Sequence, residues 1–89
     1  SGKVSKGVKT GALCEFKPER FADSILMLKA AVENGTHVLK MDGRLLCSLY
    51  HNEPVLVLDN TDFGDGFILV LHGEEVCFVK ASVLRKIET

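Results

Sequence analysis

The sequence predicts an α+β domain, in which an N-terminal and a C-terminal helix pack on one face of an antiparallel sheet of about five strands. Two observations lead to this fold class. Apolar residues recur at helical spacing near both ends of the 89-residue chain, and short apolar runs separated by turn residues fill its middle. A chain of this length forms one domain, which we place at 12–89 after a flexible lead-in at 1–11.

The first helix is predicted over 18–34. Its apolar residues recur at spacings of four, three and four and form one stripe: Phe21, Ile25, Leu28 and Val32. Pro18 suits the first turn of a helix, and Asn34-Gly35 is typical of the left-handed cap that ends one. We therefore expect Phe21, Ile25 and Leu28 in the core.

A first hairpin is predicted around Asp42-Gly43, because this dipeptide favours the two-residue turn between β runs. Pairing Met41 with Arg44 would place His37, Arg44 and Tyr50 on one face of that hairpin. A further strand starts at Pro54, and a second hairpin is predicted around His72–Glu75. The unbroken apolar run at 67–71 indicates a strand that is central in the sheet or buried on both sides.

The closing segment, 80–88, decides between two architectures. Val79, Val83 and Ile87 stand at i, i+4 and i+8, which favours a second helix with Val83 and Ile87 in the core. The alternative is a small Sm- or SH3-like barrel that serves as a protein-interaction module, and a barrel needs a closing strand at this place.

Three stretches resemble the C-terminal part of the SARS-unique region in betacoronavirus non-structural protein three. They are GTHVLKMDGRLL at 35–46, the Pro54-Val55 strand, and ILVLHGEEVCFVKASVLRKI at 68–87. The resemblance covers a little over half of the chain, and its residues are structural rather than catalytic. The loop DNTDFGDG at 59–66 departs from the family pattern as an insertion.

This resemblance implies a frataxin-like fold and a non-catalytic module of a viral replicase polyprotein. It also implies weak binding of single-stranded RNA, or modulation of the adjacent macrodomain-like or protease domains of the same polyprotein. The implied location is the host cytoplasm, on the cytosolic side of replication membranes, within a larger membrane-anchored protein. We expect a monomer that does not itself insert into a membrane, since the longest apolar run has five residues.

An RNA-binding surface is predicted from charge and hairpin register. Residues 1–44 hold eight of the eleven Lys and Arg residues, and 45–89 hold seven of the twelve acids. Single-stranded RNA needs a basic track and an aromatic platform. The candidate residues are the hairpin face and a mobile basic arm: His37, Arg44, Tyr50, Lys3, Lys6, Lys9 and Lys17.

No pattern in the sequence predicts catalysis, a cofactor or a metal. Cys14, Cys47 and Cys77 lie far apart, without a nucleophile signature or ligand spacing. The acidic loop with Asp59 and Asp62 has Phe63 at the fifth position, where a calcium loop needs an oxygen ligand. We therefore expect that the protein is not an enzyme and that this loop is solvated.

Overall fold

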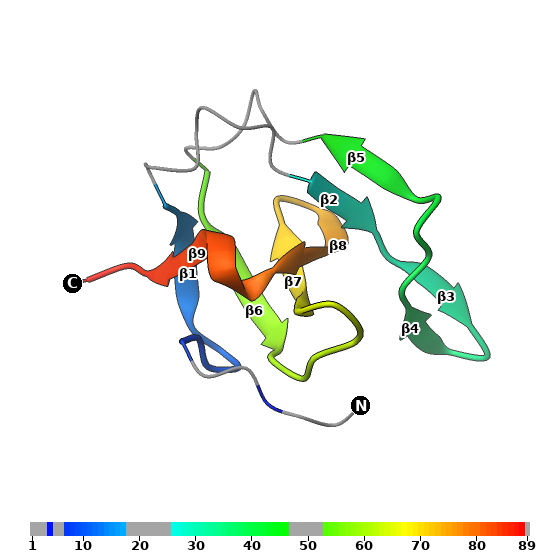
Figure 1. The fold of residues 1–89 in the computed structure, drawn as a ribbon, viewed down its shortest axis with the longest axis horizontal. Coiled ribbons are helices and arrows are strands. Elements are labelled where there is room, and N and C mark those ends of the chain that lie inside the picture. The colour runs from blue at the N-terminus through cyan, green and yellow to red at the C-terminus, as the bar shows by residue number, and fades with distance from the viewer. Residues whose placement is uncertain (1–3, 5–6, 18–25, 47–52, 89) are drawn as a thin grey trace.

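The computed structural model describes residues 4, 7–17, 26–46 and 53–88, and these fold almost entirely into antiparallel β-structure (Figure 1). The strands run in this order: β1 (Leu13–Phe16), β2 (Leu26–Lys29), β3 (Ala31–Glu33), β4 (Thr36–Val38), β5 (Arg44–Leu46), β6 (Val55–Asp59), β7 (Phe67–His72), β8 (Glu75–Lys80) and β9 (Leu84–Lys86). Within these residues the helical segment is a single 3₁₀ turn, η2 (Ala81–Val83).

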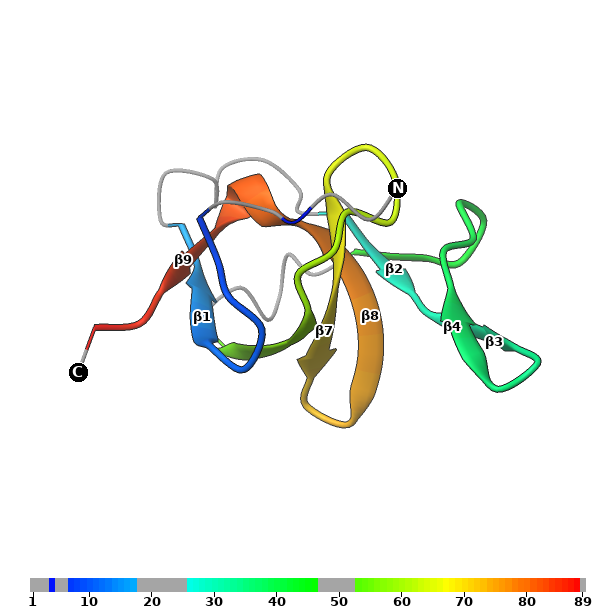
Figure 2. The same ribbon diagram turned by 90° about the horizontal axis from the view of Figure 1, so that it is seen from below.

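Seven strands form one sheet in the order β5-β2-β8-β7-β6-β1-β9, and β3 and β4 form a separate hairpin. The sheet must curl, because η2 joins β8 to β9 although three other strands lie between them in the sheet. A flat sheet would separate those two strands by roughly 19 Å. The four residue steps from Lys80 to Leu84 span at most about 14 Å. Figure 2 shows the curled sheet, with η2 arching from β8 to β9.

The predicted frataxin-like α+β fold is therefore wrong, and the described residues form a small, partly open barrel. The segment that decided between the two architectures, 80–88, is not a helix but a 3₁₀ turn followed by the closing strand β9. β9 pairs with β1 in the register Glu15↔Arg85. This is the small-barrel alternative, in which the last strand closes on the first.

The N-terminal helix prediction is also wrong where the structure describes it. Residues 26–29 and 31–33 are strands, and Phe21 and Ile25 lie outside the described residues. Leu28 is buried as expected, but on β2. The hairpin turn lies at Asn34-Gly35, with φ of 53° and 75°, and not at Asp42-Gly43. Left-handed φ suits a helix cap and a two-residue β-turn equally, so this dipeptide fitted both interpretations.

The second hairpin is confirmed, with β7 and β8 paired from Phe67↔Lys80 to His72↔Glu75. β7 is central in the sheet, and its first four residues are buried, as the unbroken apolar run predicted. The barrel interior is one apolar cluster: Val8, Cys14, Phe16, Met27, Val55, Val57, Ile68, Val70, Cys77, Val79 and Leu84. Val83 and Ile87 are only half-buried, and Leu84 takes the core position predicted for them.

The other face of the central strands carries a second, smaller cluster of Leu28, Phe67, Leu69 and Phe78. Phe63, from the loop after β6, covers this face, and its ring meets that of Phe78 edge-on at 4.9 Å between centroids. Asp62 shapes the same loop, because its Oδ1 accepts hydrogen bonds from the N–H groups of Gly64 and Gly66. Asp59 Oδ1 likewise accepts from the Thr61 N–H, so the acidic loop uses two of its carboxylates to hold its own backbone.

Candidate functional site

The segment before β1 is fastened to the end of β6 by Asn60. The Asn60 Nδ2 donates to the Val8 carbonyl at 3.0 Å, and the Asn60 backbone N–H donates to the Thr10 hydroxyl at 3.1 Å. Gly11 N–H then donates to the Val57 carbonyl at 2.8 Å, which extends the β1–β6 pairing. This segment lies across one end of the barrel and adds the buried Val8 to the core.

Lys86 reaches the same end of the barrel from β9. Side chains alternate along a strand, so Lys86 lies on the same face as Leu84, two residues earlier, and Leu84 is buried in the barrel interior. Lys86 is paired with Cys14 of β1. At this position the strand leaves the barrel, and Lys86 is exposed. The alternation therefore places a lysine at the mouth of the apolar interior.

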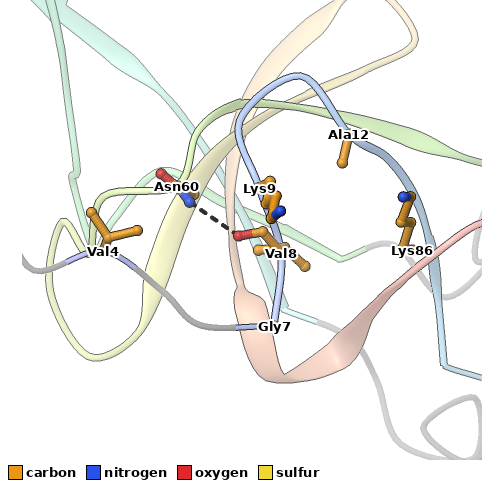
Figure 3. Close-up of a pocket in the computed structure, with 7 residues that line it drawn as sticks. All are labelled: Val4, Gly7, Val8, Lys9, Ala12, Asn60 and Lys86. Atoms are coloured by element: carbon orange, nitrogen blue, oxygen red, sulfur yellow. Dashed lines mark hydrogen bonds between the residues drawn. The ribbon is translucent and has the colours of Figure 1, made fainter.

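Between these elements the surface forms a hollow of about 430 Å³, lined by Val4, Gly7, Val8, Lys9, Ala12, Asn60 and Lys86 (Figure 3). Figure 3 shows the side chains of Val8, Lys9 and Ala12 along the N-terminal segment, and Lys86 beside them from the last strand. The wall is apolar, and its two charged residues are both lysines. We call this hollow, with the two that adjoin it, the β9 groove.

The adjoining hollows continue along β9. One of about 410 Å³ lies between residues 9–13 and 86–87, and one of about 620 Å³ is lined by Glu15 and residues 85–88. All three hollows share Lys86. The three hollows therefore adjoin one another around the end of β9, where an extended chain that runs along this strand would contact them.

Lys9 and Lys86 differ in their electrostatics from the paired cations of the chain, one of which, Arg85, lines the third hollow of the groove. Lys29 pairs with Glu75, Lys40 with Glu33 and Arg85 with Glu15, at 3.5, 2.6 and 2.6 Å. Among the described residues, neither Lys9 nor Lys86 has an ion-pair partner. Burial raises the pKa of the Cys14 thiol behind the groove, and the positive charge of Lys86 offsets that rise only in part.

The structure brings one of the predicted RNA-binding residues, Lys9, into the β9 groove. Lys17 follows β1, and its N–H donates to the Val83 carbonyl. His37 lies on β4 opposite Val32, whereas Arg44 lies on β5 opposite Leu28, so these two do not share a hairpin. Lys3, Lys6 and Tyr50 lie outside the described residues. RNA binding by these residues stays a prediction.

Sequence reasoning missed Lys86 and Asn60. The sequence predicts a helix at Lys86, and residues two apart on a helix do not share a face. On a strand the same spacing places Lys86 and Leu84 on one face. Asn60 follows an apolar strand, as loop residues often do, but no local pattern points to its partners 50 and 52 residues away. Only the strand interpretation of 84–86 could have found the lysine.

Comparison with known proteins identifies no relative, since no protein-family model, curated protein or solved structure matches the chain. Across the described ranges, no helix has the length and apolar character to cross a bilayer. In the same residues, no group of three or more His, Cys, Asp or Glu side chains is placed to hold a metal ion.

Proposed function

We propose that the chain is a small SH3-like barrel that serves as a protein-interaction module and binds an extended segment of a partner along β9. The observation that carries this proposal is the β9 groove, whose three hollows meet at Lys86 on β9, an outermost strand of the sheet. The expectation that the protein is not an enzyme is part of the same proposal. The frataxin-like architecture that the viral resemblance implied is not the observed one.

The backbone of β9 supports strand addition. Lys17 N–H donates to the Val83 carbonyl, and Ile87 N–H donates to the Leu13 carbonyl, so the odd-numbered residues face β1. Residues of an antiparallel strand alternate in which neighbour they bond to. The Lys86 N–H and carbonyl therefore point away from β1, at the edge of the described sheet. An extended peptide that pairs with such an edge obtains main-chain hydrogen bonds, and neighbouring pockets select its side chains.

The proposal is tested by titrating the ¹⁵N-labelled protein with three seven-residue peptides that alternate Val with Glu, Val with Gln, or Val with Lys. We expect at least one peptide to shift amide signals of residues 84–88 and 7–13. N-methylation of alternate peptide amides should abolish these changes, because it removes the donors of one edge.

A pair of variants separates the contribution of the Lys86 backbone N–H from that of the Lys86 side chain. Lys86→Pro removes the N–H at the edge and leaves the bonds to β1 in place, and proline is tolerated on edge strands. Lys86→Gln keeps that N–H. We expect Lys86→Pro to weaken binding of the neutral Val/Gln peptide and Lys86→Gln to leave it unchanged. If none of the three peptides shifts the amide signals of residues 84–88, the proposal is contradicted. It is also contradicted if a six-nucleotide oligouridine shifts these signals and no peptide does.

A further inference from the structure

We propose that the segment bound along β9 is acidic, and that Lys9 and Lys86 select it. This inference rests on the proposed function and adds the chemistry of the partner. It starts from the charges of the groove: the hollows of about 430 and 410 Å³ are lined by Lys9 and Lys86 and by no Asp or Glu. Glu15 and Glu88 line only the third hollow, where Arg85 is paired with Glu15.

The two lysines differ from the paired cations elsewhere on the surface. The ammonium of Lys40 is 2.6 Å from a Glu33 carboxylate oxygen, and that of Lys29 is 3.5 Å from Glu75. Within the described ranges, no carboxylate of this chain forms an ion pair with Lys9 or Lys86. Their charges are therefore available to a ligand, and complementary charge both speeds encounter and rejects partners of the wrong sign.

Strand pairing fixes where the side chains of an added strand lie relative to Lys86. A residue of an added strand that lies directly opposite Lys86 shares its face of the sheet, and opposite charges at such a position attract. Lys9 approaches the same groove from the N-terminal segment (Figure 3). Because the added strand lies on the side of β9 away from β1, a peptide carboxylate on this face pairs with Lys86, and the charge of Lys9 adds to the attraction from the same direction.

The remaining wall of the groove favours apolar residues next to the acidic residues of the ligand. Val8 is buried beneath it, Ala12 packs against the core, and Val4 and Leu13 keep 58% and 48% of their surface exposed. A ligand that covered Val4 and Leu13 would remove apolar surface from water. The predicted segment therefore combines acidic residues with aliphatic ones, which the Val/Glu peptide imitates.

The test compares dissociation constants of the three matched peptides at low salt. A cross-strand charge pair with Lys86, together with the nearby charge of Lys9, should make the Val/Glu peptide bind roughly fivefold more tightly than the Val/Gln peptide. Lys9→Gln and Lys86→Gln should each reduce this preference, and the double variant should abolish it. Lys40→Gln removes an exposed lysine from the β3–β4 hairpin and should leave the preference intact.

The outcomes distinguish the inference from the proposed function. Equal affinities for the Val/Glu and Val/Gln peptides, with shifts at 84–88, would leave the peptide-binding module standing and overturn the acidic ligand. Tightest binding of the Val/Lys peptide would also overturn it, because Glu15 and Glu88 would then dominate the groove. Tighter binding of oligouridine than of the Val/Glu peptide at these residues would show that the lysines read phosphate instead.

Discussion

The seven-stranded sheet and the β3–β4 hairpin are both antiparallel, yet they depend on different interactions. Buried residues line the interior of the curled sheet, whereas every described residue of β3 and β4 is exposed or half-buried. The hairpin projects from the barrel in Figure 1 and has the turn at Asn34-Gly35 and one ion pair, Lys40–Glu33. An isolated two-stranded hairpin is marginally stable, so this one depends on its attachment to the barrel.

The largest expected effect comes from Leu28 on β2, the strand of the barrel that leads into the β3–β4 hairpin. Leu28 is fully buried among Phe67, Leu69 and Phe78. Leu28→Ala leaves a cavity there, and we expect the free energy of unfolding to fall by about 2–5 kcal/mol. Urea unfolding followed by circular dichroism measures this loss. A loss below about 1 kcal/mol would mean that β2 is not packed on this face.

The next most sensitive point should be where the chain enters and leaves the β3–β4 hairpin, at Lys29 and Gly43. The Gly43 carbonyl accepts from Lys29 N–H at 2.7 Å, and a Cβ at Gly43 would lie 2.8 Å from the Lys29 carbonyl oxygen. Because the oxygen that the added Cβ would meet belongs to the backbone and cannot turn aside, Gly43→Ala forces the β2–β5 pairing apart, at a cost of about 1–3 kcal/mol. Gly7→Ala is the matched control, since a Cβ there meets nothing within 4 Å. Equal stabilities of the two variants in urea would contradict the close approach.

The barrel interior should also respond to pH. Burial raises the pKa of the Cys14 thiol in the folded protein, so folding favours the neutral thiol. Its contribution to stability is complete below the unfolded pKa of about 8.5 and is lost as the pH rises from there towards the folded pKa. We expect the unfolding free energy to fall less steeply above pH ~8.5 in Cys14→Ala than in the parent protein. Parallel pH profiles would show that Cys14 ionises freely.

The smallest effect should be at Val32, which is 63% exposed on β3. Val32→Ala should change the free energy of unfolding by no more than about 0.5 kcal/mol. The contrast with Leu28 is informative, because a helix over 18–34 would bury both residues on one stripe. Comparable losses for the two variants in the same urea experiment would restore the helix interpretation and reject the strands.

Strands β6, β7 and β8 of the second half could be predicted because their patterns are local. The run at 67–71 predicted the central strand, and His72–Glu75 predicted its turn. In the first half β2 could not, because Met27 and Leu28 are both buried, on opposite faces of that strand, which removes the alternation that marks a strand. Val79, Val83 and Ile87 imitated a helix although they lie on a strand, a turn and the residue after β9.

The candidate groove was even less accessible to prediction than the fold. Its N-terminal side depends on Asn60 holding Val8 and Thr10, and its other side depends on β9 pairing with β1. Both contacts join parts of the chain about fifty or more residues apart, and sequence periodicity carries no information about them. The charge distribution alone predicted Lys9 as a binding residue. Lys86 could be predicted only if 84–86 were recognised as a strand.

The pairing of Glu15 with Arg85, across a separation of 70 residues, has a consequence for synthesis. A ribosome adds about 5–20 residues per second, so β1 is synthesised roughly 4–14 seconds before β9 exists to cover its edge. During that time Cys14 and Phe16 belong to a nascent strand whose later neighbour is still being translated. The barrel closes only after residue 86 has left the ribosome, and until then β1 is a surface that a chaperone can hold.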